Sequence, residues 1–255
     1  MKRFRTGCAS KGSRMTEPCT ESPLSPIGRV RTPFTQRFGI PRQGTLLDAI
    51  PGYLELDPPY DRAEAWQGIE AFSHLWLLTW FHAGKGRGGL TVRPPRLGGN
   101  RRLGVFATRA PYRPNPVGLS LVRLAAVDLS GARASIQVRG PDLLDGTPLL
   151  DVKPYVPYCD ACPDATGGFA GRAPQPALSV RWLATARSEA EMAERRHPGL
   201  VALIEAVLAA DPRPAYQRDT RRRYAVRLYD LDIHWEAEPG LAEVVGLRPA
   251  DVDRM

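Results

Sequence analysis

The sequence has little cysteine and no long apolar run. Its four cysteines, Cys8, Cys19, Cys159 and Cys162, are too few for a disulfide scaffold in a chain of 255 residues. The most apolar segment, 71–83, is interrupted by polar side chains and is shorter than the roughly 20 residues of a membrane helix. No apolar segment of a secretory signal follows the basic start. We therefore expect a soluble, cytoplasmic protein that does not enter a membrane.

Acidic residues are absent from 85–127, which contains nine Lys and Arg. The net charge of the chain is +8, but residues 1–31 hold seven Lys and Arg against two Glu, so most of the excess lies near the start. The basic cluster is therefore more informative than the net charge. It is suited to contact phosphates, although a solvated basic surface explains the charge alone equally well.

Proline and glycine separate many short apolar runs, a pattern typical of β-rich proteins. The chain has 25 Pro and 24 Gly. We expect strands at 27–32, 52–56, 74–81, 104–108, 117–129 and 134–140. Six strands with almost no helix between them predict a closed or nearly closed antiparallel sheet. The exception is a helical turn at 61–68, with Asp61 as its N-cap, which is placed to plug one end of the barrel.

The composition predicts a mainly β protein with two domains after a short tail. Residues 1–22 lack apolar periodicity and are expected to have no fixed structure. Residues 23–172 form the antiparallel β-barrel domain, and the Pro- and Gly-rich segment 163–176 is a linker or long loop. Residues 173–255 form a smaller α+β domain.

Within the second domain, the pattern predicts strands and helices in alternation. A strand is expected at 177–183, and Ser188 with Glu191 forms a capping box that opens a helix ending before Pro198. Pro198 is then the first residue of a second helix, which continues to about Ala210. Two further strands are expected, at 224–235 and 242–247.

Two short motifs suggest chemistry that their surroundings do not support. Residues 84–89 match the G-x-G-x-x-G pattern of a dinucleotide-binding turn, but the following Leu-Thr-Val-Arg-Pro-Pro does not open the required helix. Cys159 and Cys162 form a lone C-x-x-C, whereas a zinc site needs four ligands. We interpret the first as a flexible loop and the second as two incidental thiols, and we expect no metal.

Three other groups of residues are better candidates for a binding site. Asp142 and Asp145 lie in a turn, where they either hold a polar or cationic ligand or simply form an Asx turn. His82 follows an apolar strand, at the position of a barrel mouth, and is a candidate base or ligand. Arg109 lies in a proline-constrained segment, where its planar guanidinium suits a carboxylate or phosphate unless the loop is only structural.

Eight motifs in one order connect the chain to a known family. They lie at 41–43, 68–76, 93–100, 104–109, 113–118, 142–148, 151–155 and 211–216. Together they extend over roughly residues 27–247, and their shared order is far more specific than any single motif. The chain resembles the TsaA-like, TrmO-type family of tRNA methyltransferases.

The resemblance implies an S-adenosylmethionine-dependent enzyme that methylates N6 of threonylcarbamoyladenosine at tRNA position 37, beside the anticodon. It also implies a β-barrel rather than a Rossmann fold, a homodimer with cofactor near the dimer interface, and a small domain that helps to hold tRNA. Two other functions remain open. One is a tRNA-binding protein of this fold without catalysis, and the other is a methyltransferase with a different substrate.

The resemblance also implies which residues contact the cofactor. They are Pro41, Arg42, Gln43, His82, Ala83, Arg109, Leu119, Asp142, Leu143, Leu144 and Asp145. Arg42 or Arg109 would hold the methionine carboxylate, and Asp142 or Asp145 would hold hydroxyl or amino groups or face the sulfonium. Removing a proton from N6 would assist transfer, and the candidate bases are His82, Asp145 and Tyr216.

Overall fold

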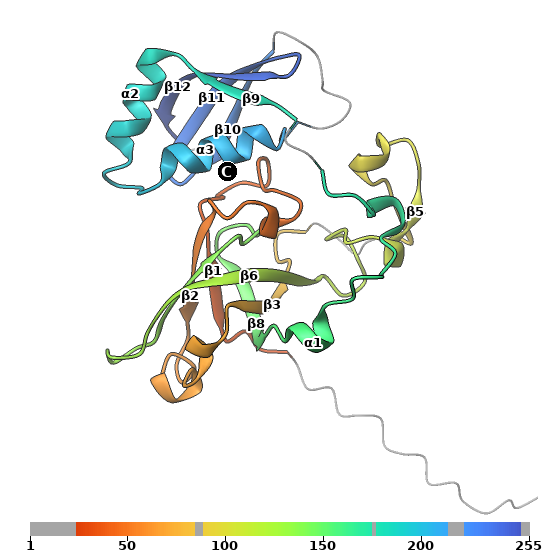
Figure 1. The fold of residues 1–255 in the computed structure, drawn as a ribbon, viewed down its shortest axis with the longest axis vertical. Helices are drawn as coiled ribbons and strands as arrows, with labels where there is room; N and C mark the ends of the chain where they lie inside the picture. Colours follow the sequence, from red (N-terminus) through yellow and green to blue (C-terminus); the bar gives the residue numbers. More distant parts are fainter. Residues whose placement is uncertain (1–23, 85–88, 175–176, 214–221, 251–255) are drawn as a thin grey trace, which may run out of the picture.

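The computed structural model describes residues 24–84, 89–174, 177–213 and 222–250. The tail predicted at 1–22 lies outside these residues. The described chain forms a β-barrel and, above it in Figure 1, a second sheet covered by two helices. None of its helices is long and apolar enough to cross a membrane.

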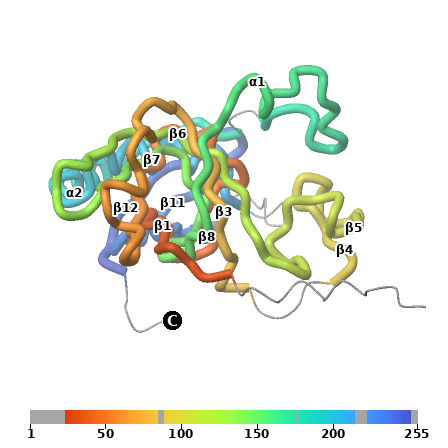
Figure 2. The backbone as a smooth tube through the Cα atoms, turned by 90° about the horizontal axis from the view of Figure 1, so that it is seen from below, coloured from red at the N-terminus to blue at the C-terminus, as the bar shows by residue number. Residues whose placement is uncertain are grey.

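Six antiparallel strands close into a barrel in the order β1-β2-β7-β6-β3-β8. They are β1 (Gly28–Arg31), β2 (Pro51–Leu56), β3 (His74–Trp80), β6 (Val117–Asp128), β7 (Ser135–Arg139) and β8 (Thr147–Pro154). Figure 2 shows β1, β3, β6, β7 and β8 around this barrel, with the pair β4 (Thr91–Val92) and β5 (Leu103–Gly104) to one side. The prediction of a mainly β protein with a closed antiparallel barrel is confirmed.

One of the six predicted strands is wrong, and another strand takes its place. Residues 104–108 contain only the end of β5, because Val105–Ala107 form a 3-10 turn that buries Val105 and leaves Phe106 exposed. The sixth barrel strand is β8, which the sequence pattern did not predict. Pro148 and Pro154 interrupt its apolar pattern, yet both residues lie in register with neighbouring strands.

The barrel core follows the alternation of strand residues. Inward-facing side chains form one cluster that includes Val30, Leu54, Leu75, Leu77, Val122, Ile136, Val138 and Leu149. Burial of each such side chain contributes about 1.5–3 kcal/mol. Trp66 joins the cluster, as expected for a segment that plugs the barrel. Asp61 is not an N-cap, because the 3-10 turn begins at Ala63 and the buried Asp61 pairs with Arg133 at 3.2 Å.

The C-terminal part is a four-stranded sheet in the order β10-β11-β12-β9. Its elements are β9 (Ser179–Trp182), α2 (Ala184–Ala193), α3 (Leu200–Ala209), β10 (Arg223–Leu228), β11 (Leu231–Glu238) and β12 (Leu241–Pro249). The sheet is antiparallel except where β9 runs parallel to β12. This arrangement confirms the smaller α+β part. The connection from the barrel includes the short helix α1 (Pro157–Asp160) and a 3-10 turn at Gly168–Ala170.

Three local predictions for the C-terminal part are wrong. Helix α2 begins at Ala184, so Ser188 lies inside it and forms no capping box. Helix α3 begins at Leu200 after Gly199, whose φ of 81° provides the turn, so Pro198 is not its first residue. The run 224–235 is two strands, because Tyr229 adopts φ 56° in the turn between β10 and β11.

The segment 33–50 belongs to the barrel half of the chain but packs into the C-terminal core. Phe34 and Ile50 are fully buried there, and Phe38, Ile40 and Leu47 pack against the same cluster. The backbone N–H of Tyr229 also donates to the carbonyl of Pro33 at 2.7 Å. The C-terminal core therefore holds the segment that carries residues 41–43.

Candidate functional site

Residues 41–44 are held against the turn that follows β7. A side chain at Gly44 would place its Cβ only 1.8 Å from the carbonyl oxygen of Gly140. The backbone N–H of Gly44 donates to Oδ2 of Asp142 at 3.4 Å. Gln43, next to Gly44, accepts a hydrogen bond from Nη1 of Arg109 at 2.8 Å. Three segments far apart in the sequence thus meet at this place.

Asp142 is the most strongly held polar side chain of the group. The hydroxyl of Ser120 donates to its Oδ1 at 2.6 Å. Burial raises the pKa of Asp142 above its usual value, although the hydrogen bonds from Ser120 and Gly44 and the charge of Arg109 act in the opposite direction. The site therefore contains a desolvated carboxyl whose pKa is raised by burial.

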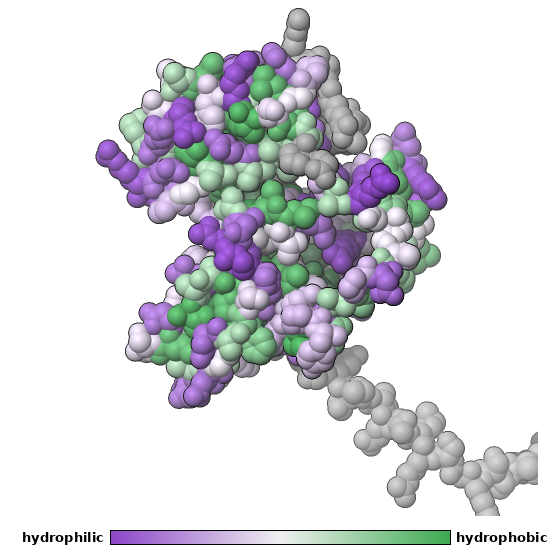
Figure 3. All heavy atoms as spheres, viewed as in Figure 1, coloured by the Kyte–Doolittle hydropathy of each residue, from purple (hydrophilic) through white to green (hydrophobic). Residues whose placement is uncertain are grey.

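The other side chains of this group reach toward solvent. Arg109 is exposed, and Leu119 on β6 is 58% exposed. The molecular surface is hollowed between the centre of the molecule and the lobe on the right of Figure 3. Arg113, by contrast, donates to the carbonyls of Thr108 and Ala110 and so stabilises the loop itself.

His82 and Ala83 connect to the same segment through Arg37. The guanidinium of Arg37 donates to the carbonyl of Ala83 and, at 3.0 Å, to the hydroxyl of Tyr112. His82 is exposed and lies beyond the end of β3, as the sequence suggested. Because Arg37 lies four residues before Pro41, these contacts link the end of β3 to the loop at 41–44.

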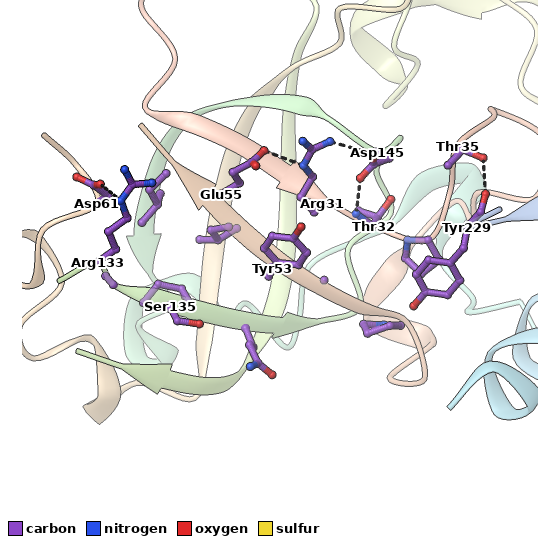
Figure 4. Close-up of a pocket in the computed structure, with 18 residues that line it drawn as sticks. Arg31, Thr32, Thr35, Tyr53, Glu55, Asp61, Arg133, Ser135, Asp145 and Tyr229 are labelled. Carbon is purple, nitrogen blue, oxygen red and sulfur yellow. Dashed lines mark hydrogen bonds and ion pairs between the residues drawn. The ribbon is translucent and has the colours of Figure 1, made fainter. Parts of the chain in front are cut away.

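Asp145 points to a different part of the barrel than Asp142. Figure 4 shows its carboxylate between Arg31 and Thr32. Its Oδ2 accepts from Nη1 of Arg31 at 3.1 Å and its Oδ1 from the backbone N–H of Thr32 at 3.0 Å. Leu143 between the two aspartates is buried in the barrel core. The turn thus separates two carboxylates that are close in the sequence.

A pocket lies beside Asp145. It has a volume of about 640 Å³ and extends from β1, β2 and β7 to Tyr229. Its other charged side chains, Glu55, Asp61 and Arg133, are paired, with Glu55 accepting from Arg31 at 2.7 Å. Gln43, Arg109 and Asp142 do not line it.

Other candidates lie elsewhere in the described structure or outside it. Tyr216 is not among the described residues, and neither are residues 85–88 of the glycine-rich loop. Gly89 is followed by β4 and not by a helix, so the loop lacks the helix of a dinucleotide-binding turn. Cys159 and Cys162 are exposed free thiols, and no three His, Cys, Asp or Glu side chains in the described ranges form a metal cluster.

Sequence reasoning missed Ser120 and Gly44 as parts of the site. Ser120 is a polar residue at an inward position of β6, between Gly118 and Val122, both of which are buried. Such an interruption of an apolar alternation is a detectable signal, because a buried hydroxyl needs a hydrogen-bond partner. Gly44 had no such signal, since its close neighbour Gly140 is far away in the sequence.

Comparison with known proteins identifies relatives that match most of the chain. Residues 29–161 match the model of the tRNA-methyltransferase O N-terminal domain, and residues 175–250 match that of the TrmO C-terminal domain. A tRNA (adenine(37)-N6)-methyltransferase of Escherichia coli is 44% identical over 226 residues, which cover 88% of this chain and 96% of that protein. A Pseudomonas aeruginosa protein, provisionally named an S-adenosylmethionine-dependent methyltransferase, is 51% identical over 89% of this chain and 98% of its own length.

The fold agrees with that of a solved relative. The crystal structure of TrmO from Pseudomonas aeruginosa superposes with a TM-score of 0.76 at 44% sequence identity, and it covers 91% of this chain and all of that one. With both domain models matched in order, the chain belongs to the tRNA-methyltransferase O family.

Proposed function

We propose that this protein is an S-adenosylmethionine-dependent tRNA methyltransferase that acts on N6 of adenosine 37, with threonylcarbamoyladenosine as its substrate. The observation that carries the proposal is the convergence of Gln43, Arg109 and Asp142 at one place on a closed barrel, in a member of this family. We further propose that the reaction takes place in the cytoplasm.

The residues at this place fit the chemistry of the cofactor. S-adenosylmethionine carries a carboxylate, an ammonium and a sulfonium, together with an adenosine. Arg109 is exposed and uses Nη1 for Gln43, which leaves further N–H groups for the carboxylate. Asp142 offers negative charge to a cationic group or an acceptor to a hydroxyl, and exposed Leu119 offers an apolar surface to the adenine.

The remaining cofactor contacts stay predictions. Pro41 and Arg42 lie in the same loop as Gln43, and Ala83 is tied to that loop by Arg37. Leu143 is buried, and Leu144 contributes its carbonyl to the turn by accepting from Thr147 at 2.6 Å. We propose that only the 142 end of this turn contacts the cofactor, because Asp145 is engaged by Arg31 and Thr32.

When bound, the cofactor supplies an electrophilic methyl group. The protein then acts mainly by holding N6 in line with that group and by excluding water. N6 shares its lone pair with the purine, so removal of its proton assists the reaction. We propose His82 over Asp145 as the base, because His82 is exposed and both carboxylate oxygens of Asp145 accept hydrogen bonds.

The proposed homodimer has a candidate surface on the barrel. In the middle of β3 and β6 the outward-facing side chains are apolar, with Leu78 opposite Leu119 and Trp76 opposite Leu121. Trp80, at the end of β3, is 36% exposed. A partly exposed apolar surface of this kind is typical of a subunit interface, and Leu119 would place the cofactor next to it.

A methylation assay tests the proposed function. The protein is incubated with methyl-labelled S-adenosylmethionine and tRNA that carries or lacks the threonylcarbamoyl group, and the nucleosides are analysed by mass spectrometry. We expect label on N6 of threonylcarbamoyladenosine. Label elsewhere would indicate another substrate, and cofactor binding without label would indicate a catalytically inactive relative.

The role of His82 is tested in the same assay. We expect His82→Ala to lower turnover while the dissociation constant for S-adenosylmethionine, measured by isothermal titration, stays close to that of the unchanged protein. Asp145→Ala serves as the comparison. Turnover that is undiminished in His82→Ala but lost in Asp145→Ala, with cofactor binding intact, would reverse this assignment.

A further inference from the structure

A second pocket lies beside the proposed cofactor site, and its wall is basic. It has a volume of about 240 Å³ and is lined by Gly44, Thr45, Asp48, His74, Arg123, Arg139 and Gly140. Gly44 belongs both to this wall and to the cofactor site, where its N–H donates to Asp142. Whatever occupies the pocket therefore lies next to the proposed reaction centre.

Three basic side chains stand in a row across the barrel strands that form this wall. His74 on β3 lies directly opposite Arg123 on β6, and Arg123 lies directly opposite Arg139 on β7. Like charges in directly opposite positions repel each other and destabilise a sheet. A row of this kind is therefore costly unless negative charge compensates it.

The protein supplies only part of that compensation among the described residues. Asp48 accepts two hydrogen bonds from Arg123, at 2.8 and 2.7 Å. The guanidinium of Arg139 makes no hydrogen bond or ion pair within the described ranges, although its charge and that of His74 also help to lower the pKa of Asp48. One carboxylate thus faces two arginines and a histidine, which leaves the pocket positive.

We propose that this pocket binds an oxyanion of the tRNA substrate through Arg139. Two sources supply this chemistry, namely a backbone phosphate next to adenosine 37 and the carboxylate of its threonylcarbamoyl group. A planar guanidinium binds either group with two parallel hydrogen bonds. The inference rests on the proposed function, and it adds the residue that positions the substrate beside the methyl donor.

Binding measurements with Arg139 variants test the proposal. The dissociation constant of tRNA, with and without the threonylcarbamoyl group, is measured by fluorescence anisotropy in the presence of S-adenosylhomocysteine. We expect Arg139→Ala to weaken binding of modified tRNA about tenfold, as for loss of one charge-assisted contact. Arg139→Lys should recover part of this loss, because lysine keeps the charge without the fork.

Arg29→Ala is the matched control. Arg29 is exposed on β1, which lies on the opposite side of the barrel from β6. The variant removes the same charge as Arg139→Ala. Because Arg29 lies far from the pocket, its loss should change the affinity for tRNA much less. Equal effects of Arg29→Ala and Arg139→Ala would show that only net charge matters and would overturn the proposal.

The two tRNAs distinguish the two sources of the oxyanion. If a phosphate is bound, Arg139→Ala weakens both tRNAs alike and reduces the slope of log K against log salt by about 0.7–0.9. If the threonyl carboxylate is bound, the variant weakens only the modified tRNA. An unchanged affinity for both, or a loss of affinity for S-adenosylmethionine by isothermal titration, would contradict the proposal. Failure of the proposed function itself is recognised separately, as absent methyl transfer and absent cofactor binding in the unchanged protein.

Discussion

Asp142 combines burial with hydrogen bonds that act in opposite directions on its charge. Burial raises its pKa, whereas Ser120, Gly44 and Arg109 favour the carboxylate. A carboxyl that stays desolvated despite these donors costs folding free energy when it is ionised. The buried carboxyl of Asp142 is therefore suited to a positively charged ligand, which would stabilise the carboxylate on binding.

The raised pKa of Asp142 predicts a particular pH dependence of stability. The native protein binds the Asp142 proton more tightly than the unfolded chain does, so this residue's contribution to stability decreases as pH rises from its usual pKa through its raised native value. We expect the free energy of unfolding of the unchanged protein, relative to Asp142→Asn, to fall across that range and then level off. Urea unfolding at a series of pH values measures this. A relative stability that increases with pH would mean that the native pKa is lowered.

Gly44 is a second residue that controls the geometry of the site, because the absence of a Cβ atom allows its backbone to approach Gly140. The Cβ of Gly44→Ala would overlap the carbonyl oxygen of Gly140, and the atoms nearest to it are all backbone atoms, which cannot rotate away as a side chain can. We expect the loop 41–44 to move away from Asp142 and the affinity for S-adenosylmethionine to fall about tenfold or more, as measured by isothermal titration.

Gly131→Ala is the control for this substitution. Gly131 lies between β6 and β7, and the nearest atom to its added Cβ is 3.7 Å away. Cofactor affinity should therefore be unchanged. A Gly44→Ala protein that binds the cofactor as tightly as Gly131→Ala does would show that the loop is not part of the site.

At the scale of elements, the segment 33–50 connects the cofactor site to the C-terminal sheet. Its apolar side chains, led by Phe34 and Ile50, pack in the C-terminal core, while Gly44 contacts the barrel. A loop of this length has little stability of its own, because ordering its backbone costs about 1–2 kcal/mol per residue. Packing at both of its ends compensates for this cost and keeps residues 41–44 in place.

Phe34→Ala tests this connection. Phe34 is 0% exposed, and such a truncation in a core costs about 3–5 kcal/mol of folding free energy. We expect a lower midpoint of thermal unfolding and, below that midpoint, weaker binding of S-adenosylmethionine, although Phe34 is not among the predicted cofactor contacts. Phe169→Ala, at a more exposed position in the connecting loop, should change neither quantity appreciably. A loss of stability without any effect on cofactor binding would show that packing of Phe34 in the C-terminal core does not position residues 41–44.

At the scale of the whole molecule, the proposed homodimer depends on the outer face of β3 and β6. Leu121→Glu places a charge opposite Trp76 in the middle of this face. Burial of an unpaired carboxylate is strongly unfavourable, so we expect the variant to be monomeric. Light scattering coupled to size-exclusion chromatography measures the mass. Met192→Glu, at an exposed apolar position of α2, should leave the mass unchanged, and a dimeric Leu121→Glu protein would exclude this face as the interface.

Prediction from the sequence was most reliable where one local pattern controls the structure. Strands β1, β2, β3, β6 and β7 alternate between core and solvent, so their positions followed from a period of two. It failed where the local signal is weak or misleading. Strand β8 contains Pro148 and Pro154, and the helix starts after Leu183 and Gly199 carry no side-chain cap.

The candidate site shows the same division. The motif at 142–145 marked both aspartates, but their spacing did not reveal that Asp142 meets Ser120 while Asp145 meets Arg31. Buried Leu143 separates them, and a backbone turn aims successive side chains in different directions. Contacts of this kind join residues roughly 20 to 110 positions apart, so no local pattern records them.

The sequence by itself determined the mainly β architecture, the placement of a barrel before an α+β part along the chain, and the family. These depend on alternation, on turn residues and on eight ordered motifs. Only the tertiary structure decided that segment 33–50 enters the C-terminal core, that Gly44 joins Asp142, and that Arg123 and Arg139 face one pocket. The physical reason is that burial and charge compensation depend on neighbours in space, and residues far apart in the sequence become neighbours only when the chain folds.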